Sequence, residues 1–363
     1  MPCARSRYAE DVTASPPEPG SRTRSVALGA VVFVAALILL FGAVNLARRS
    51  EAGAAAVASP SAATPARPSA SPPASPPASP PASPTAPGSP LPSGSPPLDA
   101  VLVGAGDIAT CSSDGDSATA SLIERIAGTV FTAGDNAYDI GSATQFRDCY
   151  DPTWGRFRDR TRPAPGNHDW ETKDLAGYLD YFGAAASPDG TSSWYSYELG
   201  AWHVIVLDSD CSKVDGCGAD SPQGQWLSAD LASSSATCTV AIWHHPRFSS
   251  GVHGNDDTVA PFWRALYDGG ADLIVNGHDH DYERFAPQDP DGREDRVRGI
   301  REFVVGTGGA ELRGFGDVRA NSELRASVGF GVIKLDLHES SYDWRFIPTT
   351  GDFSDSGQAA PCH

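Results

Sequence analysis

Acidic, histidine, tyrosine and asparagine residues recur in five short clusters, which read GDIAT, GDNAY, GNHD, WHHP and NGHDH. Carboxylate, phenolate, amide and imidazole donors together suit borderline-to-hard metals such as Fe, Mn and Zn, whereas Ca and Mg rarely take histidine. Seven donors are more than one ion needs. The clusters therefore predict a site for two metal ions that is built from Asp107, Asp135, Tyr138, Asn167, His244, His278 and His280.

Each of these residues also has an ordinary structural explanation. An Asp at the end of a strand commonly caps a helix, a buried histidine is commonly a hydrogen-bonded core residue, and Tyr138 could be a packed core tyrosine. The joint occurrence of five clusters favours the metal site. His203 and His338, which belong to no cluster, are expected to be structural.

The clusters lie at the ends of apolar runs that have the length of buried strands. Segments with helical apolar spacing lie between several runs, at 117–128, 222–233 and 257–270. The order is therefore β-α-β-α, and loops at the carboxyl ends of such strands converge and bind ligands. The runs are 100–107, 128–135, 202–208, 239–245 and 271–278.

The pattern changes after residue 300. Three short apolar runs, at 301–309, 330–339 and 341–348, follow one another without an intervening helix. We expect antiparallel strands that complete a second sheet. Residues 99–363 are enough for one large α/β domain, and a second catalytic domain would not fit.

The five clusters resemble the blocks of the calcineurin-like metallophosphoesterases, and among them the purple acid phosphatases. Those blocks run GD, GDxxY, GNH, a His before a Pro, and GHxH, and all five occur here in that order over about residues 100 to 310. The GTGG at 306–309 is also similar to a late loop of the family. The resemblance implies a two-sheet α/β/β/α sandwich of the metallophosphoesterase type.

The resemblance also implies how the seven donors divide. A bridging carboxylate, here Asp135, would screen the repulsion between two cations roughly 3.5–4 Å apart. The first ion would be held by Asp107, Asp135, Tyr138 and His280, and the second by Asp135, Asn167, His244 and His278.

Tyr138 discriminates most strongly between branches of the superfamily. Many relatives carry a histidine two residues after the first Asp, where this chain has Ala109. A phenolate is a hard anion that favours Fe(III). The resemblance therefore implies Fe(III) with a divalent Fe, Zn or Mn ion.

Two further histidines resemble substrate-contacting residues of the family. His168, next to Asn167, is similar to the outer-sphere histidine that contacts the phosphate or protonates the leaving group, and Asp169 could orient it. His253 lies in a Gly-rich segment and resembles a histidine of plant-type members. The second histidine of WHHP, His245, is expected to pack behind the ligands or to contact phosphate.

These roles imply hydrolysis of small phosphate monoesters by in-line attack of a metal-bound hydroxide. A phosphodiesterase or nucleotide-processing hydrolase would use the same metals, and loops 139–160, 170–200 and 281–299 contain no pattern that separates the two. A third possibility is a non-catalytic surface adhesin that keeps the fold. The sequence does not indicate an oligomeric state.

The first 98 residues differ in composition from the rest. Residues 25–47 carry no charge, and as a helix they would measure roughly 35 Å, against about 30 Å of hydrocarbon core. They predict a transmembrane helix after a cytoplasmic tail at 1–24, although AGAAAVA after the run also fits a cleaved signal peptide. Residues 48–98 are rich in Pro, Ala and Ser and predict a disordered linker.

Cysteine usage supports an extracellular catalytic domain at 99–363, and the net charge of this domain bears on its partners. Six cysteines follow the linker, an even number that is typical of disulfides in an oxidising compartment. Cys211 with Cys217 is the most plausible local pair, and Cys238 could pair with Cys362. From residue 99 onward, 20 basic against 41 acidic side chains give a formal charge of −21, which disfavours nucleic acid as a partner.

Overall fold

The structure is a computed structural model, and it describes residues 99–363. The predicted tail at 1–24, transmembrane helix at 25–47 and linker at 48–98 lie outside the described residues. Among the helices of residues 99–363, none combines the length and the apolar character needed to cross a membrane.

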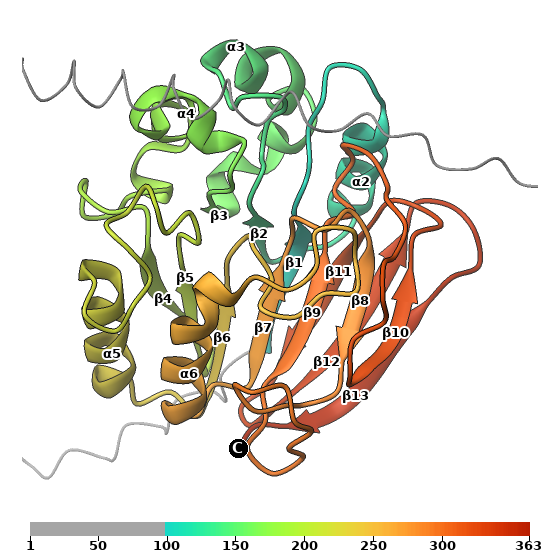
Figure 1. The fold of residues 1–363 in the computed structure, drawn as a ribbon. Helices are drawn as coiled ribbons and strands as arrows, with labels where there is room; N and C mark the ends of the chain where they lie inside the picture. The colour runs from blue at the N-terminus through green and yellow to red at the C-terminus, as the bar shows by residue number, and fades with distance from the viewer. Residues whose placement is uncertain (1–98) are drawn as a thin grey trace, which may run out of the picture. The chain divides into compact units, whose positions relative to one another are not determined.

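The first of two mixed β-sheets has six strands in the order β13-β12-β11-β1-β2-β3 (Figure 1). Its strands β1, β2 and β3 are parallel, and β11 pairs with β1 in the antiparallel sense. The strands are β1 (Ala100–Ala105), β2 (Thr129–Ala133), β3 (Thr161–Ala164), β11 (Gly331–Leu337), β12 (Ser341–Pro348) and β13 (Asp355–Pro361).

The second sheet has seven strands in the order β10-β8-β9-β7-β6-β5-β4. Its centre is parallel, because β5, β6, β7 and β9 run in one direction. The strands are β4 (Tyr195–Leu199), β5 (Trp202–Val206), β6 (Cys238–Ile242), β7 (Leu273–Asn276), β8 (Tyr282–Phe285), β9 (Arg301–Val305) and β10 (Ser322–Ala326).

Side-chain caps mark the start of two of the five α-helices in the described residues, α3 and α5. Before α5, the Ser221 side chain accepts a hydrogen bond from the backbone N–H of Gly224, and Pro222 occupies the first helical position. Ser142 and Gln145 form a capping box at α3. The α-helices are α2 (Gly115–Ile123), α3 (Ala143–Gln145), α4 (Ala176–Phe182), α5 (Pro222–Ser233) and α6 (Ala260–Asp268).

Side chains alternate along the strands of the second sheet and face two apolar layers. Val204 of β5 joins a large buried cluster that also contains Leu102 of the first sheet, so this layer lies between the sheets. Ile205 faces the other way and packs with Leu227 of α5 and Leu266 of α6. Figure 1 shows these two helices together beside β5 and β6, while α2 contacts β11 of the first sheet. The predicted two-sheet α/β fold is confirmed.

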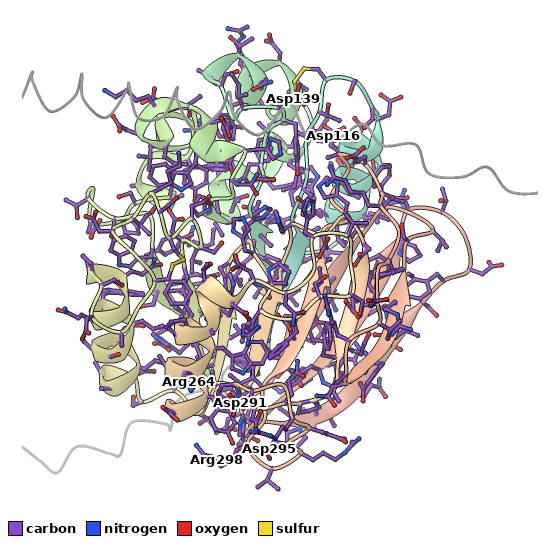
Figure 2. All side chains as sticks on the ribbon, viewed as in Figure 1. Asp116, Asp139, Arg264, Asp291, Asp295 and Arg298 are labelled. Carbon is purple, nitrogen blue, oxygen red and sulfur yellow. A yellow bond between two sulfur atoms is a disulfide. The ribbon has the colours of Figure 1, made fainter. Side chains whose placement is uncertain are left out.

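The prediction for the region after residue 300 is partly wrong. Of the three predicted strands, β11 and β12 pair with each other in the antiparallel sense in the first sheet, whereas β9 belongs to the second sheet, where it runs parallel to β7 and antiparallel to β8. The reason is β8, which runs back from the end of β7, so that the segment 286–300 turns at the opposite end of the domain before β9 begins. Figure 2 shows Asp291 and Arg298 of this segment at the opposite end from Asp139.

Three disulfides tie the described domain together. The two predicted pairs, Cys211–Cys217 and Cys238–Cys362, are both present, and the third joins Cys111 to Cys149. The Cys238–Cys362 bond connects the first residue of β6 to the segment after β13 across 124 residues of sequence. Closing so long a loop restricts the unfolded chain and thereby stabilises the fold.

His203 is structural, as expected, and it joins β5 to two neighbouring elements. Its side chain is 5% exposed, its Nδ1 lies 2.7 Å from Glu198 of β4, and its Nε2 lies 2.7 Å from Asp230 of α5. Burial alone would lower the pKa of this imidazole, but the hydrogen bonds and charges of Asp230 and Glu198 raise it above its ordinary value. Both ring nitrogens can donate to the two carboxylates only in the protonated form.

Replacing His203 with Gln is expected to destabilise the domain more at pH 5 than at pH 9. A histidine whose pKa is raised in the folded state contributes its full stability below the unfolded pKa of about 6.5, and loses it as the pH rises through the folded value. The expected loss at pH 5 is roughly 1–2 kcal/mol, or about 2–6 °C in Tm. Thermal unfolding of parent and variant at both pH values measures it, and an equal loss at both would contradict the protonated pairing.

Candidate metal centre

All seven predicted ligands lie in loops that follow parallel strands. Asp107 follows β1, Asp135 and Tyr138 follow β2, and Asn167 follows β3, while the three histidines follow β6 and β7. Parallel strands place the ligand loops of each sheet at one edge of that sheet, and the packing of the two sheets brings the two sets of loops together. His244, His278 and His280 complete the set.

Three of the seven residues adopt a backbone conformation that non-glycine residues rarely take. The φ angle is +59° at Asp107, +50° at Asp135 and +71° at His278. Such residues cluster at functional sites, where the surrounding structure holds a strained backbone in place. The backbone conformation therefore indicates a functional site independently of which side chains are present.

The first group of donors surrounds the Tyr138 hydroxyl. This oxygen lies 2.7 Å from Asp107 Oδ1, 3.0 Å from Asp135 Oδ2 and 3.2 Å from His280 Nε2. His280 Nε2 is also 3.2 Å from Asp107 Oδ1. The four side chains are the set predicted for one ion, and they are almost completely buried.

The second group surrounds His244 Nε2. This nitrogen lies 3.2 Å from Asp135 Oδ2, 3.2 Å from Asn167 Oδ1 and 3.3 Å from His278 Nδ1. The same oxygen of Asp135, Oδ2, therefore belongs to both groups. The structure thus brings together the four side chains predicted for the other ion and places Asp135 between the two sets.

Three of the predicted ligands use one polar atom for a hydrogen bond to the backbone, which leaves their other polar atom free to bind a metal ion. The backbone N–H of His278 donates to Asp107 Oδ2 (2.8 Å), and that of His168 donates to Asp135 Oδ1 (2.8 Å), so each carboxylate turns its other oxygen inward. His244 Nδ1 lies 2.8 Å from the carbonyl of Ala133, which can only accept, so this nitrogen carries the proton. In the neutral imidazole, the Nε2 lone pair of His244 then faces the second group.

The spacing of these atoms fits bound cations. Ligands at right angles around an ion, each at about 2.1 Å, are roughly 3 Å apart, and the separations in both groups lie between 2.7 and 3.3 Å. Burial and the charges of Asp107 and Asp135 raise the pKa of Tyr138 well above its ordinary value. A phenolate at Tyr138 therefore needs a cation at its oxygen. The role of the seven residues as metal ligands stays a prediction.

His168 lies beside the first donor group, and its predicted orienting partner, Asp169, is wrong. The His168 ring packs against Tyr138 with 4.4 Å between ring centroids, and it lines a cavity of about 210 Å³ beside the first group. Its Nδ1 lies 2.5 Å from the carbonyl oxygen of Asp139. The Asp169 carboxylate instead accepts hydrogen bonds from the backbone N–H and the side-chain amide of Asn136. It therefore connects its own loop to the loop after β2.

His253 reaches the centre from the loop after β6. Its ring lies 4.3 Å from that of His278, between centroids, and its backbone N–H donates to Asp279. Arg313 donates to His253 Nε2 at 2.6 Å. No pattern in the sequence indicated Arg313, which follows the GTGG segment and lines the same cavity as His168.

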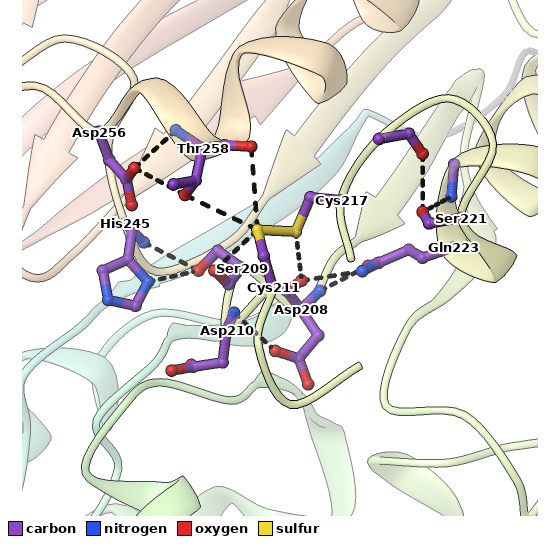
Figure 3. The surroundings of a disulfide bond; sticks show 12 residues. Asp208, Ser209, Asp210, Cys211, Cys217, Ser221, Gln223, His245, Asp256 and Thr258 are labelled. Atoms are coloured by element: carbon purple, nitrogen blue, oxygen red, sulfur yellow. Dashed lines mark hydrogen bonds between the residues drawn. A yellow bond between two sulfur atoms is a disulfide. The ribbon is translucent and has the colours of Figure 1, made fainter. Parts of the chain in front are cut away.

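His245 packs beside the second group and is held by the loop after β5. Its ring lies 4.3 Å from that of His278, between centroids, and its Nδ1 lies 2.8 Å from Ser209 Oγ. Figure 3 shows that the Cys211–Cys217 disulfide adjoins Ser209 in this loop. Ser209 was not identified from the sequence, because it belongs to none of the five clusters.

The sequence is similar to that of known proteins. The sequence model of the Calcineurin-like phosphoesterase family matches residues 95–282. Purple acid phosphatase 15 of Arabidopsis thaliana is 31% identical over 162 residues, which are 39% of this chain and 30% of that protein. Acid phosphatase A of Cryphonectria parasitica is 28% identical over 197 residues, which are 47% of this chain and 39% of that protein.

Two solved structures share the fold. The purple acid phosphatase PPD1 of yellow lupin has a TM-score of 0.55 at 18% identity and covers 71% of this chain and 53% of its own. GAP50, described as the anchor in the inner membrane complex of Plasmodium, has a TM-score of 0.57 at 16% identity and covers 72% of this chain and 89% of its own.

The chain spans well under half of the two curated relatives, at 30% and 39% of their lengths. The family match, however, covers more than half of this chain, and its residues 95–282 include all seven predicted ligands. On that match, the chain belongs to the calcineurin-like phosphoesterase family.

Proposed function

We propose that the chain is an extracytoplasmic phosphatase that hydrolyses small phosphate monoesters with two metal ions. The observation that carries the proposal is the pair of four-donor groups that share Asp135 Oδ2. When bound, two ions would supply an activated water for in-line attack and neutralise charge on the phosphate. Fe(III) with a divalent Fe, Zn or Mn ion is the pair that Tyr138 favours.

In this proposal, His168 transfers a proton to the leaving group. Because the carbonyl of Asp139 can only accept, the proton of the neutral imidazole lies on Nδ1 and Nε2 is free. Nε2 lies 3.9 Å from Asp135 Oδ2, at the cavity beside the predicted metal site. A protonated His168 would therefore donate from Nε2 to the departing oxygen of the ester.

Basic and neutral donors around the cavity favour a substrate with several terminal phosphate oxygens. His168 and Arg313 both line the cavity beside the first donor group, and His253 packs on His278 of the second group. A monoester dianion offers three terminal oxygens to such donors, whereas a diester offers two. This difference supports the monoester over the diester that the same metals could also hydrolyse.

We expect kcat/KM for p-nitrophenyl phosphate to exceed that for bis(p-nitrophenyl) phosphate by at least about tenfold, which is roughly 1.4 kcal/mol of transition-state binding. Both substrates release the same chromophore, so one absorbance assay compares them directly. Faster turnover of the diester would reverse the ranking and favour the phosphodiesterase. Turnover of neither substrate by metal-loaded protein would argue against both enzymes.

The proposed location is the outer face of a cell membrane, with one span at residues 25–47 and the catalytic domain outside. Secretion after signal cleavage is the alternative. Three disulfides in the described domain support an oxidising compartment. Protease treatment of intact cells tests the location, because an external domain is cleaved and an internal one is protected.

A further inference from the structure

Residues 310–316, here called the 310–316 loop, lie directly against the predicted metal centre. The backbone N–H of Ala310 donates to the carbonyl of Asp107 at 3.0 Å, and that of Arg313 donates to the carbonyl of His280 at 2.9 Å. The backbone of the loop is therefore fixed to two predicted ligands of the same ion. Its side chains have a defined position relative to that ion.

His280 has one ring nitrogen without a hydrogen bond. Its Nε2 belongs to the first donor group, whereas its Nδ1 is buried and has no hydrogen-bond partner in the described part of the chain. A metal-bound histidine ordinarily donates its other N–H to a carboxylate or a carbonyl, which fixes the ring and strengthens the ligand. The carboxylate oxygen Oε1 of Glu311 lies 3.9 Å from this nitrogen.

Arg313 holds Glu311 in that position. Its Nε donates to Glu311 Oε1 at 2.8 Å and its Nη2 donates to the same oxygen. Its Nη1 lies 2.6 Å from His253 Nε2, and the His253 ring packs on His278 of the second donor group. One guanidinium therefore connects residues beside both predicted ions.

An ordinary surface ion pair is the competing explanation, since the Glu311 side chain is 58% exposed and such pairs contribute little to stability. Two observations go beyond it. Arg313 makes a third side-chain contact, to His253, and the side chain that Glu311 approaches is a nearly buried imidazole with 4% exposure. A modest rotation of the exposed carboxylate would bring it within hydrogen-bonding distance.

We propose that Glu311 is the outer-sphere carboxylate of His280, and that Arg313 is the positioning residue that holds both Glu311 and His253. The proposal rests on the proposed function, because it assumes that His280 holds an ion. The Nδ1–H of His280 donates to Glu311, which orients Nε2 toward the ion. Glu311 and Arg313 thus act on metal affinity through His280, without touching the ion.

The test compares Glu311→Ala with Asp317→Ala in the full-length chain. Asp317 is an exposed acid three residues beyond Gly314 in the same connection, so its removal changes the net charge equally. Metal affinity is measured by competition with a chelator, and Tm is measured before metal loading. Glu311→Ala should weaken the affinity for one ion by about 10- to 100-fold, with Tm unchanged, whereas Asp317→Ala should change neither.

Two further variants separate positioning from charge. Glu311→Gln keeps an acceptor oxygen without the charge, so its affinity should lie between those of the parent and Glu311→Ala. Arg313→Lys keeps the charge but cannot reach Glu311 and His253 together. It should weaken metal affinity, and adding it to Glu311→Ala should cause little further loss, because both act through His280.

The outcomes distinguish this proposal from the proposed function. If the parent binds two ions and Glu311→Ala binds them as tightly, Glu311 is not an outer-sphere partner and only this proposal fails. The same holds if Asp317→Ala weakens binding as much as Glu311→Ala does. If the metal-supplied parent binds no ion, the proposed function itself fails.

Discussion

Replacing Asp135 with Asn is expected to reduce kcat by at least about a thousandfold and to leave the chain with fewer than two metal ions. Asp135 Oδ2 is the atom that both donor groups share, at 3.0 Å from Tyr138 Oη and 3.2 Å from His244 Nε2. Asn keeps the shape of the side chain and can still accept the backbone hydrogen bond from His168, but it loses the charge that separates two cations. Metal-ion stabilisation amounts to several kcal/mol, and each 1.36 kcal/mol is about tenfold in rate.

A buried aspartate outside the centre provides the matched control. Asp116 of α2 is 3% exposed and accepts a hydrogen bond from Thr153 at 2.9 Å (Figure 2). Asp116→Asn makes the same chemical change in a buried position, and it should retain both ions and turn over at nearly the parent rate. Elemental analysis and steady-state kinetics on the three proteins make the comparison. Two bound ions and a kcat within tenfold of the parent in Asp135→Asn would contradict the bridging role.

Replacing Tyr138 with Phe is expected to remove the visible absorption of the iron-loaded protein and to reduce its retention of Fe(III). Phe keeps the ring that packs on His168, but it removes the oxygen that lies 2.7 Å from Asp107 and 3.2 Å from His280. Without a phenolate there is no phenolate-to-iron charge transfer. A hard trivalent ion also loses an anionic ligand, so divalent ions should compete better.

Tyr150 is the matched control for this prediction. It is fully buried, and among the described residues its hydroxyl has no hydrogen-bond partner. Tyr150→Phe should keep the absorption band, the iron content and the turnover of the parent. A visible spectrum with metal analysis is the measurement. A band that persists in Tyr138→Phe would refute the assignment, whereas a colourless but active parent would exclude Fe(III) while leaving a dinuclear centre possible.

The main strands could be predicted from the sequence because each one is a continuous apolar run of strand length. Apolar runs ending in Gly, Asp or Asn matched β1, β2, β5, β6 and β7, and a polar cluster followed four of these five strands. Within each sheet the ligand loops lie at one edge because the strands are parallel, whereas the meeting of the two sets of loops depends on how the two sheets pack. The strand before Asn167 was not recognised, because β3 is four residues long and contains Pro163, which is tolerated there at the edge of the sheet.

The arrangement beyond residue 280 depends on contacts between segments that are distant in sequence. β8 was not recognised because it is four residues long and directly follows the histidine cluster, and without it the parallel placement of β9 could not be deduced. The residues that contact His168 and His253 could not be predicted for the same reason. Asp139 reaches His168 across 29 residues, and Arg313 reaches His253 across 60, so neither contact has a signature in local sequence.

The most direct test of the dinuclear centre is a count of metal ions in the purified full-length chain, made together with turnover of a phosphate monoester before and after chelation. The two donor groups, which share Asp135, predict two ions per chain. Turnover should be lost when the ions are removed and should recover when they are returned. Turnover that survives complete removal of metal would contradict the account, and so would a chain that binds no ion when supplied with iron, zinc and manganese.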